Sequence, residues 1–433
     1  MNDSVERARA LFTEALSLLG QGRFGDAEQR LEASLQHVPG RASTLLNLGV
    51  TRLRLARPQA ALQALDAALA AEPDAADAWG HGGAALAGLG RFDEALASFD
   101  EALARAPGDQ AASYHRAMTL NALRRDSEAL AAFDALTRSH PDKGLFRLQQ
   151  ARTLQCLGRH DEALPAYRRA LALDPTLGEG WSLLGQLLKD RGQAEEAASC
   201  FEQALAHGAP ADLNRWFLAA VRGGSAPAHA PPAYVRVLFD GYAAEFDRHL
   251  RQGLHYRAPE ELDRLLASTA TPRSSAAIDL GCGTGLCAPM LLRHARQLDG
   301  VDLSAAMLER ARARRHYRQL VQSELAAHLQ STSERYGLVV AADVFIYVGA
   351  LDAVFAGVRR VLEPGGRFAF SVETADEAVP YELRPTLRYA HGVSYLRELA
   401  LRQGLRWLAE HAAPLREDQG RPVPGRYLLL AAA

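Results

Sequence analysis

A hydrophobic pattern with a period of 34 residues runs through the first half of the chain. In each unit an alanine follows another small residue by twelve positions and precedes a bulky residue by four. The alanines are Ala27, Ala61, Ala95, Ala129, Ala163 and Ala197, and the bulky residues are Leu31, Leu65, Phe99, Phe133, Tyr167 and Phe201. Prolines recur at the same interval from Pro39 to Pro175, and a proline ends a helix because it lacks the backbone N–H. The pattern predicts six pairs of helices that stack through these small and bulky positions.

The period is lost after residue 211, where a different organisation begins. A helix over 212–222 is expected to close the array, and a Gly-, Pro- and Ser-rich linker over 223–232 follows it. The chain therefore divides into an all-α solenoid over 1–211, the closing helix and linker over 212–232, and a second domain over 233–433.

Apolar and amphipathic segments alternate in the second domain, after lead-in helices over 234–250 and 259–268. The apolar segments predict strands at 275–280, 298–301, 336–342 and 367–373, and the amphipathic segments predict helices at 286–296, 304–314 and 351–362. This alternation is typical of an α/β domain with a parallel, doubly wound sheet.

Charge and cysteine content narrow the classes of protein. The chain has 49 Lys and Arg against 51 Asp and Glu, a formal charge of -2, so a nucleic-acid partner is not expected. Its cysteines are Cys156, Cys200, Cys282 and Cys287, too scattered for a disulfide framework and without a second pair to complete a zinc site. Neither a signal peptide nor an apolar run long enough to span a bilayer is present, so we expect a reduced, cytoplasmic protein.

A glycine-rich turn follows the first predicted strand, with the spacing D-x-G-x-G-x-G from Asp279 to Gly285. A dinucleotide site requires a third glycine at position 286, where Leu286 stands. Asp279, just before the first glycine, would repel a pyrophosphate but suits an ammonium or sulfonium group. Asp302, at the end of the second strand, can accept hydrogen bonds from both hydroxyls of a ribose.

With the segments 300–308, 341–349 and 362–373, this turn resembles the class I S-adenosylmethionine-dependent methyltransferases over about 234–430. The resemblance implies a Rossmann-like domain with a mostly parallel seven-stranded sheet. It also implies that Asp279 and the backbone of 281–283 hold the methionine end, that Asp302 holds the ribose, and that Glu324 binds the adenine amino group. The residues implied to contact the cofactor are Asp279, Gly281, Cys282, Gly283, Asp302, Leu303, Met307, Glu324, Leu325 and Tyr242.

Some of these positions have a second interpretation. Glu324 could instead act as the acid at a helix N-terminus. By analogy with ubiquinone/menaquinone-type enzymes, Tyr242 and Phe246 could close over the cofactor, or they could only anchor an amphipathic helix. Asp343 and His391 are candidate general bases, with capping of a turn and an ordinary loop histidine as the alternatives. Because Asp343 is not followed by Pro-Pro, amide-type nitrogen acceptors are disfavoured.

The repeating units, clearest over 76–109, resemble the tetratricopeptide repeat, about six copies from 8 to 211. The resemblance implies a concave face, formed by the first helix of each unit, that binds a protein or peptide. The residues expected to line it are Phe12, Leu46, Val50, Tyr114, Met118 and Leu148. The Lys/Asn set that clamps a C-terminal carboxylate is missing. This face could hold an extended or helical peptide, or the second domain could cover it.

Two functions follow from these features. The first is a methyltransferase that moves a methyl group from S-adenosylmethionine to a small-molecule or protein acceptor, with the repeats recruiting a substrate or partner. The second is an interaction protein whose second domain is inactive or senses the cofactor. The complete set of Asp279, two turn glycines and Asp302 favours the first.

Overall fold

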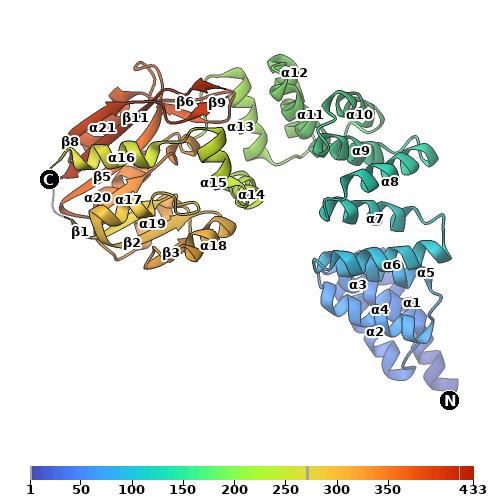
Figure 1. Ribbon diagram of the computed structural model, residues 1–433. Coiled ribbons are helices and arrows are strands. Elements are labelled where there is room, and N and C mark those ends of the chain that lie inside the picture. Colours follow the sequence, from blue (N-terminus) through green and yellow to red (C-terminus); the bar gives the residue numbers. More distant parts are fainter. Residues whose placement is uncertain (1, 270–272, 419) are drawn as a thin grey trace. The chain divides into compact units, whose positions relative to one another are not determined.

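The computed structural model describes residues 2–269, 273–418 and 420–433. The chain forms two compact units, residues 1–184 and 185–433 (Figure 1). The helices of the repeats are α1 (Asn2–Gly20), α2 (Phe24–His37), α3 (Ala42–Arg54), α4 (Pro58–Ala71), α5 (Ala76–Gly88), α6 (Phe92–Arg105), α7 (Gln110–Ala122), α8 (Asp126–Ser139), α9 (Gly144–Cys156), α10 (His160–Leu173), α11 (Gly178–Asp190) and α12 (Ala194–Ala206). The predicted helix pairs are confirmed. The second helix of each of the first five pairs (α2, α4, α6, α8 and α10) ends two residues before one of the periodic prolines.

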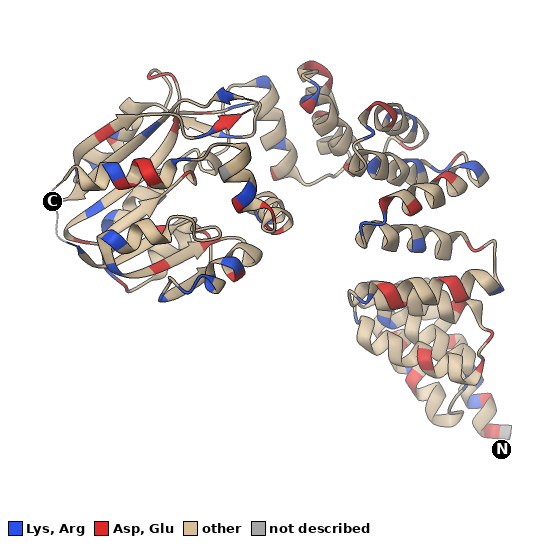
Figure 2. Ribbon diagram, in the orientation of Figure 1, with Lys and Arg blue, Asp and Glu red and all other residues tan. Residues whose placement is uncertain are grey.

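The small and bulky positions pack as the period predicts. A Cβ added to Gly83 would lie 2.7 Å from Cε1 of Phe99, and one added to Gly185 would lie 2.7 Å from Cε1 of Phe201. A side chain at either glycine would therefore force paired helices apart. Acidic and basic residues are interspersed along the helices of the repeats (Figure 2), and Arg91 forms an exposed ion pair with Glu94.

The second unit contains a mostly parallel sheet with the strand order β3-β2-β1-β4-β5-β11-β8. These strands are β1 (Ser274–Leu280), β2 (Ala295–Asp302), β3 (Gln319–Gln322), β4 (Tyr336–Ala341), β5 (Leu362–Thr374), β8 (Leu405–Ala412) and β11 (Gly425–Ala432). β11 is antiparallel to β5 and β8, whereas β1 to β5 are parallel. The hairpin of β6 (Tyr381–Leu383) and β7 (Tyr389–His391) extends the sheet at β5, and β9 (Glu417–Asp418) pairs with β10 (Arg421–Pro422).

Helices α13 (Ala211–Arg222) and α14 (Pro232–Tyr242) precede the sheet. The remaining helices are α15 (Phe246–Arg248), the π-helix η1 (His249–Gly253), α16 (Ala258–Ala267), α17 (Ala288–His294), α18 (Ala305–Ala313), α19 (Leu325–Ser331), the 3₁₀ turn η2 (Phe345–Tyr347), α20 (Asp352–Val361) and α21 (Val393–Arg402). The helix predicted over 286–296 is shorter because Ala295 already begins β2.

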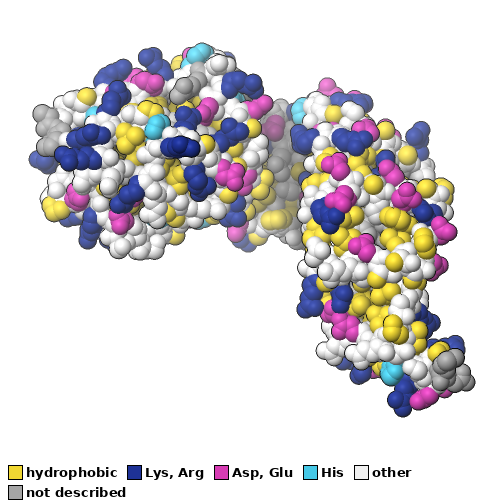
Figure 3. Space-filling view, turned by 60° about the horizontal axis from the view of Figure 1, so that its bottom comes forward, with side chains coloured by type: hydrophobic (Ala, Val, Ile, Leu, Met, Phe, Trp, Pro, Cys, Tyr) yellow, Lys and Arg dark blue, Asp and Glu magenta, His cyan; other side chains and the backbone are white. Residues whose placement is uncertain are grey.

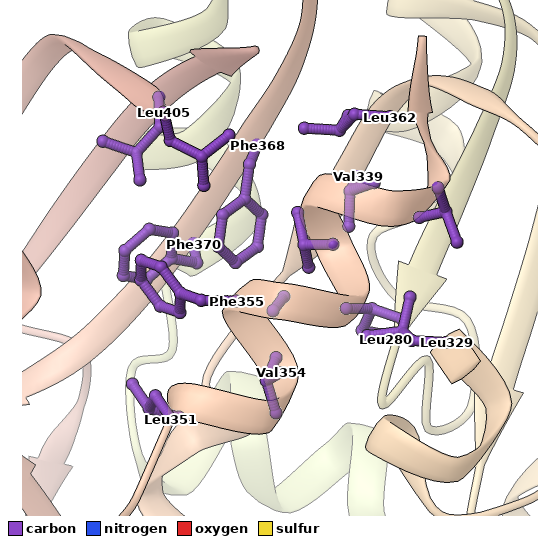
Figure 4. Close-up of a cluster of buried hydrophobic side chains, with 14 of the residues drawn as sticks. Leu280, Leu329, Val339, Leu351, Val354, Phe355, Leu362, Phe368, Phe370 and Leu405 are labelled. Atoms are coloured by element: carbon purple, nitrogen blue, oxygen red, sulfur yellow. The ribbon is translucent and has the colours of Figure 1, made fainter. Parts of the chain in front are cut away.

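Alternating residues of the strands build a core on each face of the sheet. On one face Phe355 of α20 packs edge-on against Phe368 and Phe370 of β5, with ring centroids 5.5 and 5.6 Å apart (Figure 4). On the other face Leu338 and Val340 of β4 belong to a cluster that also includes residues of α16 and α17. Burying both faces fixes the strand register and hence the positions of the turns at the strand ends.

Candidate functional site

A cavity of about 660 Å³ lies at the carboxyl ends of β1 to β4. The strand order places β1 next to β4 while the chain continues outward through β2 and β3, and such a switch point is where open α/β sheets bind ligands. The cavity residues at or directly after these strand ends are Asp279, Gly281, Cys282, Gly283, Thr284, Asp302, Leu303, Glu324, Leu325, Asp343 and Val344. The volume suits a small molecule or cofactor.

The turn after β1 needs its glycines. Gly281, Gly283 and Gly285 have φ of +67°, +53° and +85°, a region that side chains disfavour. The N–H of Gly281 donates to the carbonyl of Val301 at 2.8 Å, which fixes the turn to β2. A Cβ on Gly281 would lie 2.2 Å from Cγ2 of Val344. The loop after β4 therefore leaves no room for a side chain at this position, and the backbone of Gly281 remains uncovered by a side chain of its own.

Gly281→Ala is expected to destabilise the second unit and to abolish ligand binding at the cavity. Left-handed backbone costs a side chain about 1–2 kcal/mol, and overpacking against Val344 adds about 1–3 kcal/mol. Gly404→Ala is the matched control, because Gly404 has φ of +63° but open space around its Cα. Calorimetric unfolding should show the larger loss for Gly281→Ala, and adding Val344→Ala should restore part of it. Equal losses for the two glycines would refute the packing argument.

Two carboxylates face the cavity beside this turn. Oδ2 of Asp279, a residue 1% exposed, accepts a hydrogen bond from the hydroxyl of Tyr317 at 2.8 Å. Asp302 accepts from the N–H of Gly283 at 2.9 Å through Oδ2 and from the N–H of Ser304 at 2.8 Å through Oδ1. Among the described residues neither acid has an ion-pair partner, so together they form a negative site suited to a cationic ligand.

Burial raises the pKa of both acids. Burial, helped by the charge of Asp302, raises the pKa of Asp279 to about 7, although the hydrogen bond from Tyr317 lowers it. For Asp302 burial also raises the pKa, while the N–H groups of Ser304 and Gly283 lower it. Charges held at a cost in solvation are typical of a binding site.

The lead-in helices cover the glycine turn. Asp240 of α14 accepts a hydrogen bond from Oγ of Ser304 at 2.5 Å. Asp247 of α15 accepts from the hydroxyl of Thr284 and from the guanidinium of Arg314. These bonds join both helices to the turns after β1 and β2.

The two aromatic residues predicted as a lid lie in this cover, and both line the cavity. Phe246 is 3.7 Å from the place of a Cβ on Gly283, and the ring of Tyr242 is 5.6 Å from that of Phe246. The hydroxyl of Tyr242 is buried and has no hydrogen-bond partner among the described residues.

The residues expected near the adenine also lie together. Leu303, Met307, Glu324 and Leu325 all line the cavity, as does Cys282. Glu324 also caps α19, because its Oε2 accepts from the N–H of Ala327 at 2.8 Å, so both interpretations of this residue agree with the geometry. Burial raises the pKa of the Cys282 thiol, which keeps it neutral.

Asp343 lines the cavity, but its carboxylate is already bound. Nη1 of Arg416 donates to its two oxygens at 2.9 and 3.0 Å, and Nη2 of Arg416 donates to Glu373. Its N–H donates to Oγ of Ser371 at 2.8 Å, and its φ is +53°. Burial raises the pKa of Asp343, while the charge of Arg416 lowers it. Both carboxylate oxygens already accept hydrogen bonds from the guanidinium, which favours a structural role, and the role of Asp343 as a general base stays a prediction.

The structure contradicts the predicted role of His391. The residue is fully buried, and its Nε2 donates toward the carbonyl oxygens of Val348 at 2.9 Å and Gly349 at 3.1 Å. Burial lowers its pKa to about 4, against these two bonds, and it is not part of the cavity lining. His391 therefore joins β7 to the loop after β4 instead of serving as a base.

The segment predicted as a Gly/Pro linker is bound to the second unit. The carbonyl of Ala228 accepts from the N–H groups of Gly349 and Ala350, both at 2.8 Å, and the N–H of Ala230 donates to the carbonyl of Tyr347 at 2.9 Å. The hydroxyl of Tyr389 donates to the carbonyl of Pro227 at 2.9 Å. We call residues 227–232 the strap; it forms part of the cavity lining through His229, Ala230 and Pro232.

Sequence reasoning missed several residues at this site. Asp240 and Asp247 are seven positions apart in a helical lead-in, a spacing that places two acids on one face. That signal was present. Tyr317, Arg388 and Arg416 were not predicted as site residues; Tyr317 reaches the site through its hydrogen bond to Asp279, and the two arginines line the cavity.

In the repeats, most residues predicted for the concave face are half-buried. Phe12, Leu46, Val50, Tyr114 and Met118 remain partly accessible, and hydrophobic side chains gather along the middle of the repeat surface seen in Figure 3. Leu148 is the exception, because only 2% of it is exposed. Its side chain packs against Gly180, where an added Cβ would lie 3.2 Å from Cδ1 of Leu148. The prediction of Leu148 as a binding residue is therefore wrong; it is a packing residue.

Comparison with known proteins identifies both parts of the chain. The family described as tetratricopeptide repeat matches residues 12–178 in overlapping segments, and a second family of that description matches 157–216. The family described as methyltransferase domain matches residues 278–370. The chain thus contains tetratricopeptide repeats over 12–216 followed by a methyltransferase domain.

Its relatives are bacterial methyltransferases. Trans-aconitate 2-methyltransferase of Paracidovorax citrulli is 32% identical over 110 residues, 25% of this chain and 42% of that protein. Ubiquinone biosynthesis O-methyltransferase of Serratia proteamaculans is 26% identical over 27% of this chain and 51% of its own length. The chain thus spans about half or less of these relatives.

Among solved structures, magnesium protoporphyrin IX methyltransferase of Synechocystis PCC 6803 with bound SAH is 17% identical. The structural match covers 47% of this chain and 99% of that enzyme's chain, with a TM-score of 0.36.

Within the described residues, every helix is too short or too polar to cross a membrane.

Proposed function

We propose that the protein is an S-adenosylmethionine-dependent methyltransferase of the cytoplasm, with the cofactor in the cavity beside β1 and β2. The observation that carries the proposal is the convergence of Asp279, the bare backbone of Gly281 and Asp302 on one cavity. The free, buried thiols of Cys282 and Cys287 agree with a reducing compartment.

The residues fit this cofactor on grounds of charge and shape. The ammonium and sulfonium groups are cationic, and neither the buried Asp279 nor the half-buried Asp302 has a cationic partner among the described residues. Asp302 is used by two N–H groups, yet each carboxylate oxygen has a second lone pair left for a ribose hydroxyl. Glu324 and Leu325 would lie at the adenine.

The sulfonium group supplies an already activated methyl group, so the protein mainly positions the acceptor. Asp279 and Asp302 fix two ends of the cofactor, and Gly281 allows close approach of the backbone. Phe246 and Tyr242 cover the turn and exclude water, which strengthens electrostatic attraction at the site. Ionised Asp279, held by Tyr317, orients the ammonium group.

Calorimetric titration of the full chain with S-adenosylhomocysteine tests the proposal directly. We expect saturable binding of one molecule per chain, and the same titration with NAD should give no heat of binding. A protein that is folded by circular dichroism yet does not bind S-adenosylhomocysteine would instead be an interaction protein with an inactive second domain.

The pKa of Asp279 predicts a proton linked to binding. In the free protein this acid keeps a proton up to about pH 7, whereas a bound ammonium group favours its ionised form. Affinity for S-adenosylhomocysteine should therefore rise with pH up to about 7, with protons released on binding below that pH. Titrations at pH 6 in buffers of different ionisation enthalpy measure this release, and Asp279→Asn should eliminate it.

The same shift has a defined effect on stability. Between pH 3.8 and about 7 the native chain holds more protons on Asp279 than the unfolded chain, so this group lowers the stability of the free protein as pH rises. For the binding experiment at pH 6, a release of protons that is unchanged in Asp279→Asn would assign the linked proton to another group.

We also propose that the repeats recruit a protein or peptide partner through their half-buried apolar residues. Tyr114 packs against Phe133 and Phe146, with centroids 6.2 and 5.6 Å away, yet remains partly accessible together with Met118. Replacing Tyr114 and Met118 by Asp should weaken capture of the partner and leave affinity for S-adenosylhomocysteine unchanged. A parallel loss of cofactor affinity would show that this face serves the second domain.

A further inference from the structure

A second group of cavity residues is not used by the cofactor site. Tyr347 lies at its centre: its ring is 5.4 Å from that of Phe239, and the guanidinium of Arg388 lies 4.5 Å from its centroid. Its carbonyl oxygen accepts the N–H of Ala230 from the strap. We call Ala230, Phe239, Tyr347 and Arg388 the acceptor wall; all four line the cavity.

The acceptor wall is connected to the glycine turn by aromatic contacts. Phe239 lies 5.9 Å from Phe246, and Phe246 lies against Gly283. A ligand beside Phe239 and Tyr347 would therefore share the cavity with a cofactor held at Gly283. A methyl acceptor has to share the cavity with the cofactor, and the acceptor wall offers it a binding surface.

Arg388 is the member of the wall that gives it a charge preference. The other arginine of the cavity, Arg416, is saturated by Asp343 and Glu373. Arg384, on the same hairpin, is paired with Glu373 and Glu382. Arg388 has no ion-pair partner among the described residues and contacts the face of Tyr347, so its N–H donors are available to a ligand.

The chemistry of the wall indicates which ligand fits. A guanidinium remains protonated and presents a planar fork that matches a carboxylate. Asp343 lies near enough to interact with the charge of Arg388, so a monoanion is favoured over a phosphate dianion. Phe239, Tyr347 and Ala230 leave an apolar space for the rest of the molecule.

We infer that the methyl acceptor is a small carboxylic acid with an apolar body, bound through its carboxylate by Arg388 and methylated on that carboxylate. This inference rests on the proposed function. A lone pair of a carboxylate oxygen forms the bond to the methyl carbon, and the electron pair of the carbon–sulfur bond passes to sulfur. The products are a methyl ester and S-adenosylhomocysteine, and no proton is released. A carboxylate is ionised at neutral pH and needs no general base, in agreement with the engaged states of Asp343 and His391.

The first test measures charge preference in binding. Full-length protein saturated with S-adenosylhomocysteine is titrated with octanoate and with octanamide, which has the same chain but no charge. We expect octanoate to bind at least about tenfold more tightly. Arg388→Gln should abolish this preference, Arg388→Lys should keep part of it, and Arg406→Gln, at an exposed arginine of β8, should leave it intact. Equal binding of the two probes, or a preference that survives Arg388→Gln, overturns the inference.

The second test identifies the bond that is formed. A protein-free metabolite extract is incubated with the enzyme and S-adenosylmethionine carrying a labelled methyl group. Methyl esters release labelled methanol in alkali, whereas methyl ethers and methylamines do not. Alkali-labile label that Arg388→Gln lowers more than tenfold supports the inference; alkali-stable label, or none from a protein that binds S-adenosylhomocysteine, overturns it. Failure to bind S-adenosylhomocysteine would instead remove the proposed function itself.

Discussion

Asp302→Ala should lower the affinity for S-adenosylhomocysteine by about 100-fold or more. A hydrogen bond to a charged acceptor contributes about 1.5–3 kcal/mol, and the ribose would form two of them with this carboxylate. The substitution also frees the N–H groups of Gly283 and Ser304, which Asp302 holds at 2.9 and 2.8 Å. Both the ligand contact and the order of the turn would then be lost. Calorimetric titration of the full chain measures the change.

Two further variants separate charge from shape at this position. Asp302→Asn keeps the size of the side chain, but its amide NH₂ group would face the N–H of Gly283 or of Ser304, and two donors cannot bond to each other. This variant should therefore restore little of the affinity that Asp302→Ala loses. Glu309→Gln removes an exposed carboxylate from α18, the helix that follows Asp302 in the chain, and should leave affinity unchanged. Near-normal affinity in Asp302→Ala would refute the assignment of the ribose to this residue.

The stability of Asp302→Ala should fall less than its affinity, because two effects on the free protein oppose each other. The charge of Asp302 raises the pKa of Asp279, so removing it relieves repulsion between the two acids. Freeing the N–H groups of Gly283 and Ser304 costs stability, about 1–3 kcal/mol for each donor left buried without a partner. Calorimetric unfolding of the free protein measures the net change.

The parts of the fold governed by periodic patterns could be predicted from sequence. The 34-residue period fixed the helix pairs because each small residue faces a bulky one, as Gly83 faces Phe99. Buried strands such as β4 were recognised from their apolar runs. β3, four residues long with exposed ends and a half-buried middle, carries no such run and was not among the strands predicted from the pattern.

The site could be predicted where a motif lies within one turn, and not where it depends on distant segments. The acid and glycines of 279–285 lie at consecutive positions, so their chemistry is visible in the sequence. Asp343 also stood at a strand end, but its partner Arg416 is 73 residues away and decides its state. His391 likewise became a structural residue through carbonyl groups of another segment. The strap had the composition of a linker, and only its bonds to 347–350 show otherwise.

Arg416→Met should destabilise the second unit by about 3–5 kcal/mol, the usual result of leaving buried charges without their partner. Arg416 is 8% exposed, and its guanidinium holds Asp343 from the loop after β4 and Glu373 from β5. The loss corresponds to a fall of roughly 6–20 °C in the unfolding temperature of this unit. Differential scanning calorimetry of the full chain measures it, with Arg406→Met as the exposed control, expected to change stability by less than about 0.5 kcal/mol.

Neutralising the acids distinguishes a structural triad from a catalytic one. Adding Asp343→Asn and Glu373→Gln to Arg416→Met removes the unpaired charges, and an uncharged set of similar volume can be as stable as the ion pairs it replaces. The triple variant should therefore regain most of the lost stability and retain affinity for S-adenosylhomocysteine. If Asp343 is structural, methyl transfer should recover together with stability. A stable triple variant that binds S-adenosylhomocysteine but transfers no methyl group would return Asp343 to a direct role in the reaction.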